Sequence, residues 1–253
     1  MSEGSGRHGG HEFAQWLTRV ERRHQTHPNQ RWRDAATLIL IDRAETIPKV
    51  LLGRRHAGHT FLPGRFVFPG GRVERGDARM PVATPLHAAV EARLLKRVSR
   101  PSPAKARAFA LAAIRETFEE TGLLIGRKQA GERGKPRRRA SLFEHAGVYP
   151  DLASMHFIAR ALTPPGRPRR FDTRFFAADA AAIAHRVDGV VGPDAELVEL
   201  VWLPITEVEL LEMPTITKVV LKELEARNAA GLGHDLPVPF YRMLHRRFVR
   251  EVL

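Results

Sequence analysis

Residues 113–124 read Ala113-Ile-Arg-Glu-Thr-Phe-Glu-Glu-Thr-Gly-Leu-Leu124, and this stretch decides how the rest of the chain is interpreted. It is typical of the end of a helix, because Gly122 suits a C-cap with positive φ. Glu116, Glu119 and Glu120 follow one another at i, i+3 and i+4, so the three carboxylates share one helical face. Like charges at that spacing repel, so the helix gains from them only if a cation lies between them.

The acidic face has two interpretations. It is either an ordinary solvated face or a site for a hard divalent cation such as Mg²⁺, which takes oxygen ligands and is completed by water and substrate phosphates. An upstream stretch favours the cation site: Phe66-Val-Phe-Pro-Gly-Gly-Arg-Val-Glu-Arg-Gly-Asp77. Its adjacent glycines, Gly70 and Gly71, allow a tight turn in which the backbone passes close to another group.

Together the two stretches resemble the Nudix box, in which a glycine, five residues and a glutamate are followed, seven residues later, by Arg-Glu-hydrophobic-x-Glu-Glu-x-Gly-hydrophobic. Gly71 and Asp77 match the first half, with Asp77 in place of the glutamate. Residues 115–123 match the second half, with Thr117 at a position that is usually hydrophobic. The gap departs most from the pattern, because residues 78–114 supply 37 positions instead of seven, an insertion of about thirty residues.

The resemblance implies an α/β/α sandwich, with a mixed β-sheet between helices, and an enzyme that hydrolyses a diphosphate joining a nucleoside to another group. The implied cofactor is Mg²⁺ or Mn²⁺, held by Glu116, Glu119, Glu120 and the carbonyl of Gly71. Arg115 is expected to hold the glycine loop against the helix through a carboxylate. The implied catalytic residues are therefore Arg115 and the three glutamates.

The general base stays open at this stage. Glu119 lies in the box, whereas Glu196 and Glu199 lie outside it, in a loop and strand expected within residues 192–204. All three carboxylates have suitable chemistry, and geometry has to decide between them.

The insertion is expected to be helical and to cover residues 78–106. Residues 85–97 are rich in Ala and Leu, and residues 99–103 end that helix with serines and prolines. A second helix is predicted from 104 to 121. A helical insert at this point resembles the Nudix branch of the peroxisomal coenzyme A and acyl-coenzyme A diphosphatases. Two further stretches resemble the same branch, residues 169–176 and a partial upstream signature comprising Leu51, Leu52, Arg55, Gly64 and residues 68–71.

Two β-hairpins are predicted from apolar, β-branched runs, one from residues 35–41 and 49–55 and one from residues 155–162 and 171–177. The loop at 163–170 is rigid and basic, and it adjoins an aromatic strand, which suits a diphosphate and a flat base. The substrate-binding candidates are Arg54, Arg55, Arg169, Arg170, Arg174 and Phe175. The alternative is a pair of hairpins with exposed arginines whose aromatic side chains only pack.

The chain is expected to hold one Nudix domain at 34–230, preceded by an N-terminal extension at 1–33. The tail at 231–253 carries aromatic residues and is expected to pack on the domain or on a partner subunit. Two more helices are predicted, an amphipathic one at 215–227 and a short one after Pro204 with Thr206 as its N-cap.

Composition narrows the class of protein. The sequence contains no cysteine, which excludes a disulfide framework, a thiolate zinc site and a cysteine nucleophile. No apolar run reaches the length of about 18 residues that a membrane span needs. Residues 1–10 lack the apolar core of a signal peptide. We therefore expect a cytoplasmic protein without a membrane partner, and a homodimer is among the states that the resemblance allows.

The formal net charge of +13 raises the question of nucleic-acid binding. The basic residues are scattered through loops and are not interleaved with aromatic ones, so a dedicated nucleic-acid surface is not favoured. A positive field equally attracts polyphosphate substrates. The basic run at 127–139 is interpreted as a solvated loop, with phosphate or RNA binding as the alternative.

Three functions compete. The first is hydrolysis of coenzyme A or acyl-coenzyme A, which depends on the insertion and the partial signatures. The second is a Nudix hydrolase for ADP-ribose, a dinucleotide or a capped RNA. The third is a Nudix-fold protein that binds nucleotides without catalysis, which the intact glutamates at 116, 119 and 120 disfavour.

Overall fold

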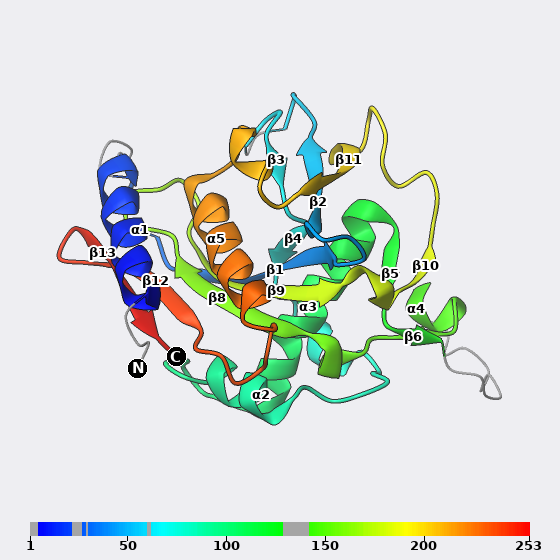
Figure 1. Cartoon of the computed structure of the whole chain (residues 1–253). Helices are drawn as coiled ribbons and strands as arrows, with labels where there is room; N and C mark the ends of the chain where they lie inside the picture. Colours follow the sequence, from blue (N-terminus) through cyan, green and yellow to red (C-terminus); the bar gives the residue numbers. More distant parts are fainter. Residues whose placement is uncertain (1–4, 22–26, 29, 60–61, 129–141) are drawn as a thin grey trace.

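A mixed β-sheet forms the centre of the molecule (Figure 1). The computed structural model describes residues 5–21, 27–28, 30–59, 62–128 and 142–253. Within these residues the main path of the sheet runs β11-β2-β1-β9-β8-β12-β13, with β3 paired to β2 and β4 paired to β1. The strands are β1 Arg33–Asp42, β2 Lys49–Arg55, β3 Phe66–Val67, β4 Gly70–Arg72, β8 His156–Leu162, β9 Phe171–Asp179, β11 Leu197–Pro204, β12 Pro239–Leu244 and β13 Arg247–Val252.

The strand β1 lies in the interior of the sheet because it is apolar on both faces. It pairs in parallel with β9 along nearly its whole length, from Arg33 opposite Phe171 to Ile41 opposite Asp179. Its antiparallel pairing with β2 and the antiparallel pairing of β8 with β9 confirm the two predicted hairpins.

Helices cover both faces of the sheet (Figure 1). On one face, α3 (Pro103–Thr121) packs on the side chains of Ala36 and Leu38. On the other face, Ile39 and Ile41 share a core with α5 (Thr215–Ala229) and α1 (Ser5–Glu21). Successive residues of a strand point to opposite faces, so the apolar run of β1 supplies both cores. The predicted α/β/α sandwich is confirmed.

The helix that carries the box has a defined start and end. The Ser102 hydroxyl accepts a hydrogen bond from the Lys105 N–H at 3.2 Å, and Pro103 occupies the first turn, where its missing N–H costs nothing. Gly122 ends the helix with φ of +74°, which confirms the predicted C-cap. A Cβ at Gly122 would lie 2.2 Å from the Val187 carbonyl oxygen, so the position has no room for a side chain.

The insertion contains one short helix, α2 (Ala88–Leu94), preceded by the 3₁₀ turn η2 (Asp77–Arg79). The helix is shorter than the predicted span 85–97, because its N-cap is His87. From its last turn, Arg93 donates to the backbone carbonyls of His234 and Asp235, each at 2.8 Å. The insertion is thereby joined to the segment that leads into β12.

The two ends of the chain meet at one edge of the sheet. The hairpin of β12 and β13 joins the sheet through parallel pairing of β12 with β8. The helix α1 packs on it, and the Thr18 hydroxyl accepts a hydrogen bond from the Phe248 N–H at 2.8 Å. Figure 1 shows α1 lying alongside this hairpin.

The helix predicted after Pro204 with Thr206 as its N-cap is wrong. The structure has only the 3₁₀ turn η5 (Val208–Leu210), and its N-cap residue, Glu207, makes no side-chain cap. The reason is lack of room, since Pro214 is already the N-cap of α5.

Smaller elements complete the described chain. They are β5 (Leu123–Ile125) paired with β10 (Ile183–Arg186), β6 (Arg127–Lys128) paired with β7 (Val148–Tyr149), the helix α4 (Leu142–His145), and the 3₁₀ turns η3 (Leu152–Ser154) and η4 (Ala180–Ala182). Of the predicted basic loop at 127–139, residues 129–139 lie outside the described residues. Among the helices described, none has the length and apolarity to cross a membrane.

Candidate active site

Arg115 joins the two halves of the box. Its Nε donates to Asp77 Oδ1 at 2.7 Å, and its Nη2 donates to the Arg72 carbonyl oxygen at 2.9 Å. The Asp77 side chain is only 2% exposed. Burial alone would lower the pKa of Arg115, but the hydrogen bond to Asp77 and the neighbouring carboxylates raise it above its ordinary value. Arg115 thus makes the contacts that its predicted role as a clamp between glycine loop and helix requires.

The same guanidinium also holds two of the box carboxylates. Its Nη1 donates to Glu116 Oε1 at 2.9 Å and to Glu119 Oε2 at 2.8 Å. Glu116 packs directly on the glycine loop, because a Cβ at Gly71 would lie 2.4 Å from its carboxyl carbon. The absence of a side chain at Gly71 is therefore what gives this carboxylate its place.

Thr117 replaces a hydrophobic residue without exposing its polar atom. The side chain is fully buried, and its hydroxyl donates to the Ala113 carbonyl oxygen at 2.8 Å, within the helix. The hydrogen bond removes most of the cost of burying a hydroxyl group. This departure from the box pattern therefore leaves the helix intact.

The carboxylates act on one another across two elements. Burial raises the pKa of Glu120 well above its ordinary value, and the charges of Glu196 and Glu116 raise it further. The charge of Arg55 and the hydrogen bond from the Gly70 N–H lower this pKa but do not cancel the rise. Burial also raises the pKa of Glu116, with Arg115 opposing that effect. Glu196 thus belongs electrostatically to the box although it comes from the loop before β11.

The donor chemistry fits a hard divalent cation. The candidate ligands Glu116, Glu119, Glu120 and the Gly71 carbonyl offer oxygen atoms only, which is what Mg²⁺ and Mn²⁺ prefer. Burial is the main cause of the raised pKa values of Glu116 and Glu120, and neighbouring carboxylates add to it. Among the described residues, however, no three such side chains converge in ligand geometry, since Arg115 engages two of them and the Gly70 N–H donates to the third at 3.3 Å. Metal binding would require these side chains to rearrange.

The two arginines at the end of β2 have different partners. Arg55 is nearly buried and its Nη2 donates to Glu196 Oε1 at 2.6 Å. Arg54 donates to Glu199 Oε2 at 2.8 Å, and both of those side chains are 44% exposed. The structure therefore brings Arg55 and Glu196 to the box carboxylates, whereas Glu199 is engaged with Arg54 on the surface.

Two predicted substrate contacts, Arg174 and Phe175, are corrected by the structure. The Arg174 side chain is 1% exposed, donates to Asp34 Oδ1 at 2.7 Å, and lies 3.8 Å above the ring of Phe109. Phe175 is buried in the core that α5 covers. Both residues lie on β9, which is an interior strand between β1 and β8, so neither side chain is accessible to a ligand.

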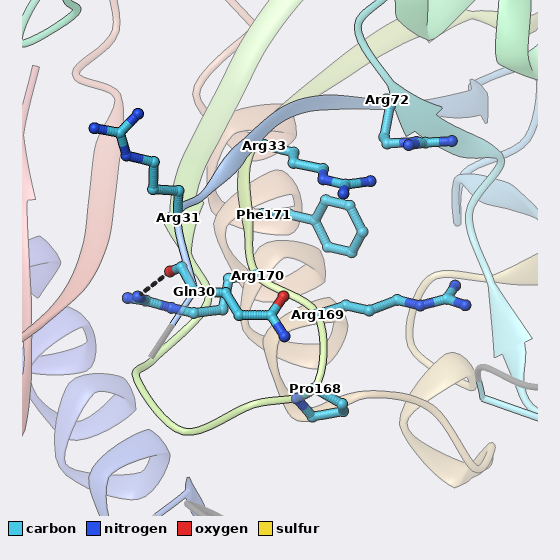
Figure 2. Close-up of a pocket in the computed structure, with 8 residues that line it drawn as sticks. All are labelled: Gln30, Arg31, Arg33, Arg72, Pro168, Arg169, Arg170 and Phe171. Carbon is cyan, nitrogen blue, oxygen red and sulfur yellow. Dashed lines mark hydrogen bonds between the residues drawn. The ribbon is translucent and has the colours of Figure 1, made fainter. Parts of the chain in front are cut away.

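Arg169 and Arg170 lie at a hollow of about 370 Å³, which we call the arginine hollow (Figure 2). Arg170 is itself buried, donates to the Gln30 carbonyl oxygen at 2.6 Å, and lies 4.5 Å from the centre of the Trp32 ring. The residues that line the hollow are Gln30, Arg31, Arg33, Arg72, Pro168, Arg169, Arg170 and Phe171.

Sequence reasoning missed Arg33 and Arg72. Arg72 directly follows Gly71, and a basic residue at that place is a signal that could have found it. Arg33 could not have been found, because the pairing of β1 with β4 and β9 brings it to the hollow.

Comparison with known proteins agrees with this geometry. A Nudix hydrolase from Alicyclobacillus acidocaldarius of known structure is 30% identical in sequence, with a TM-score of 0.56 over 78% of this chain and 92% of that one. The fold and the split box thus define a member of the Nudix hydrolase superfamily. Residues 32–213, more than half of the chain, match the family described as the NUDT19 Nudix domain, and the chain belongs to that family.

The curated relatives carry a more specific name. The acyl-coenzyme A diphosphatase NUDT19 of Gallus gallus is 30% identical over 206 residues, which cover 57% of this chain and 54% of that protein. The protein of the same name from Homo sapiens is 27% identical over 208 residues, covering 58% and 55%. The chain thus spans about half the length of the curated relatives it matches.

Proposed function

We propose that this protein hydrolyses the diphosphate of coenzyme A or acyl-coenzyme A, releasing adenosine 3′,5′-bisphosphate and a phosphopantetheine product. The observation that carries the reaction type is the convergence of Glu116 and Glu120 on the Gly70–Gly71 turn, with Glu196 acting on both. The substrate rests on the names of the relatives and on the helical insertion inside the box.

In this proposal, Mg²⁺ or Mn²⁺ is the metal, and its ligands are Glu116, Glu119, Glu120 and the Gly71 carbonyl oxygen. When bound there, such an ion neutralises phosphoryl oxygens and lowers the pKa of the attacking water. Arg115 then serves to hold the glycine loop on the helix, as it does in the structure.

Glu196 is our choice for the general base. It is the base candidate from outside the helix whose charge acts on the box carboxylates, and Arg55 orients its carboxylate through a hydrogen bond of 2.6 Å. In this role it removes the proton from the attacking water. Glu119 is engaged with Arg115, and Glu199 with Arg54, so both are less suited to accept that proton.

Turnover of a substrate panel tests the proposal. The protein is incubated with Mg²⁺ or Mn²⁺ and, separately, with coenzyme A, ADP-ribose, NADH and diadenosine polyphosphates, and the products are separated by HPLC. We expect cleavage of coenzyme A, its loss with EDTA, and a fall of about 10²-fold or more in kcat for Glu196→Gln.

The outcomes separate the candidate functions. Cleavage of ADP-ribose but not of coenzyme A would overturn the substrate assignment alone. If no member of the panel is cleaved, and the wild type shows no more turnover than Glu119→Gln, the enzymatic function would be overturned. That result would favour a nucleotide-binding protein.

A further inference from the structure

The arginine hollow and the box carboxylates lie on opposite sides of one short strand. In β4, Gly71 pairs with Ala36 and Arg72 pairs with Ala35, so the two neighbours point to opposite faces. Gly71 abuts the Glu116 carboxylate on one face. On the other face, Arg72 joins Arg33, which lies two residues before Ala35 on β1. A ligand at one site therefore lies only one strand away from a ligand at the other.

The arginine hollow is strongly basic. No Asp or Glu is among the described residues that line it. No acidic side chain in the described part of the chain pairs with the guanidinium of Arg33 or of Arg72. Several like charges held together in a concave site repel one another and raise the local concentration of anions. The hollow is therefore built to receive negative charge.

The arginines that line the hollow take more than one orientation. Figure 2 shows Arg33, Arg72 and Arg169 extending to the same side, with the ring of Phe171 beside Arg33. Arg170 instead turns to the Gln30 carbonyl and Trp32, and so fixes the floor. Planar guanidinium groups bind carboxylates and phosphates alike through paired hydrogen bonds. A phosphate monoester offers three acceptor oxygens to several arginines, whereas a carboxylate offers two.

We propose that the arginine hollow binds a phosphate monoester of the substrate, separate from the diphosphate that is cleaved at the carboxylates. This inference rests on the proposed function, because coenzyme A carries such a phosphate on its ribose. The monoester is close to a dianion at neutral pH and presents three acceptor oxygens. The hollow thereby makes the protein selective for substrates with a third phosphate.

A pair of substrates that differ only in this phosphate tests the inference. The ratio of kcat/KM for coenzyme A over dephospho-coenzyme A is measured for the wild type, Arg33→Gln, Arg169→Gln and, as a matched control, Arg247→Gln. The control removes an exposed arginine from β13, at the far edge of the sheet. We expect a ratio well above ten for the wild type and the control, and a fall of roughly tenfold for each hollow variant. The far-UV circular dichroism spectrum and the midpoint of urea unfolding, compared with those of the wild type, show whether each variant is folded.

Calorimetry supplies a readout that does not need the metal. The affinities for adenosine 3′,5′-bisphosphate and for AMP are compared in the same four proteins with EDTA present. The wild type should prefer the bisphosphate, and Arg33→Gln should bind both alike. A ratio near one in the wild type, or a preference that both hollow variants retain, would overturn the inference.

The two proposals can fail separately. If coenzyme A is cleaved without regard to the third phosphate, the reaction stands and the hollow does not have this role. If coenzyme A is not cleaved, yet the bisphosphate preference is present and is lost in Arg33→Gln, the hollow stands and the assigned reaction is overturned.

Discussion

Arg115 Nε lies 2.7 Å from Asp77 Oδ1, and this contact closes the box across the whole insertion. The two residues are 38 positions apart in the chain, yet they are held as if the halves of the box were contiguous. Asp77 therefore makes the clamp contact from the position at which the box pattern has a glutamate. The inserted residues leave between η2 and α3 and do not disturb the carboxylates.

This buried pair should matter for stability more than a surface pair does. Asp77→Ala leaves Arg115 mostly buried, with Glu116, Glu119 and the Arg72 carbonyl oxygen as its remaining partners. We expect the free energy of unfolding to fall by about 2–4 kcal/mol. The matched control is Glu199→Ala, which removes the exposed partner of Arg54 and should cost less than about 1 kcal/mol. Urea denaturation measures both. Equal losses in the two variants would contradict the assignment of the clamp.

Gly71→Ala should separate activity from stability. The added methyl group meets the Glu116 carboxyl group, the flexible end of a side chain, which can move aside at small cost. We therefore expect a change in the free energy of unfolding of under about 1 kcal/mol but a fall in kcat of at least about tenfold, because Glu116 is displaced. Gly76→Ala is the control, since a Cβ there meets nothing within 4 Å. Full activity of Gly71→Ala would show that the position of Glu116 is unimportant.

At Gly122, a substitution should damage the fold itself. A side chain there is strained by the positive φ and also collides with the backbone oxygen of Val187. We expect Gly122→Ala to cost about 2–4 kcal/mol by thermal or urea unfolding. Gly189→Ala isolates the first effect, because Gly189 has φ of +80° but open space around it, and should cost about 1 kcal/mol. If the two variants lose the same stability, the collision with Val187 plays no part.

A stack of three histidines gives the stability a pH dependence. His234 lies between His87 and His156, with ring centres 4.4 Å apart on each side. Burial is the main cause that lowers the pKa of His156 to about 4. The charges of His234, Arg227 and Arg43 lower it further, whereas Asp179 raises it. The folded state therefore resists protonation. The contribution of His156 to stability is complete above its unfolded pKa of 6.5 and is lost as the pH falls towards 4.

Replacing His156 should flatten that dependence. Between pH 7 and pH 4.5, His156→Phe should lose about 1–2 kcal/mol less stability than the wild type, after allowance for partial exposure of the ring. His185→Gln changes an exposed histidine on β10 and serves as the control. Unfolding curves in urea across this pH range measure the difference. If the free energy of unfolding falls with pH equally steeply in His156→Phe and in the wild type, the histidine stack is not the source of the pH dependence.

The sequence predicted what local chemistry determines. The helix to Thr121 and its cap at Gly122 follow from residues within a few positions of one another, and so does β2 from Lys49 to Arg55. Arg174 shows where that reasoning ends. It stands in a basic run beside a loop, but Asp34 on β1 neutralises it, and only the order of strands brings Asp34 there.

Distant pairing also explains why the tail and the hollow could not be foreseen. Phe240 pairs with Arg160 on β8, and nothing in residues 231–253 indicates that partner. Arg33 reaches the arginine hollow only because β1 meets β4 on one side and β9 on the other. The prediction of a helix at Thr206 was wrong for a simpler reason. The start of α5 lies so close that only a short 3₁₀ turn fits before it.

Because β1 pairs with β9, the central sheet cannot be completed during synthesis until β9 has been made. A nascent chain that ends at Thr121 already holds both halves of the box and the first hairpin, but one long side of β1 still has no neighbour. Until that later strand is made, the backbone N–H and C=O groups along this edge have no partner, and the edge is open to other chains. Pairing between segments so far apart in the chain also slows folding. Synthesis of β9 therefore closes an edge at which incomplete chains could otherwise associate.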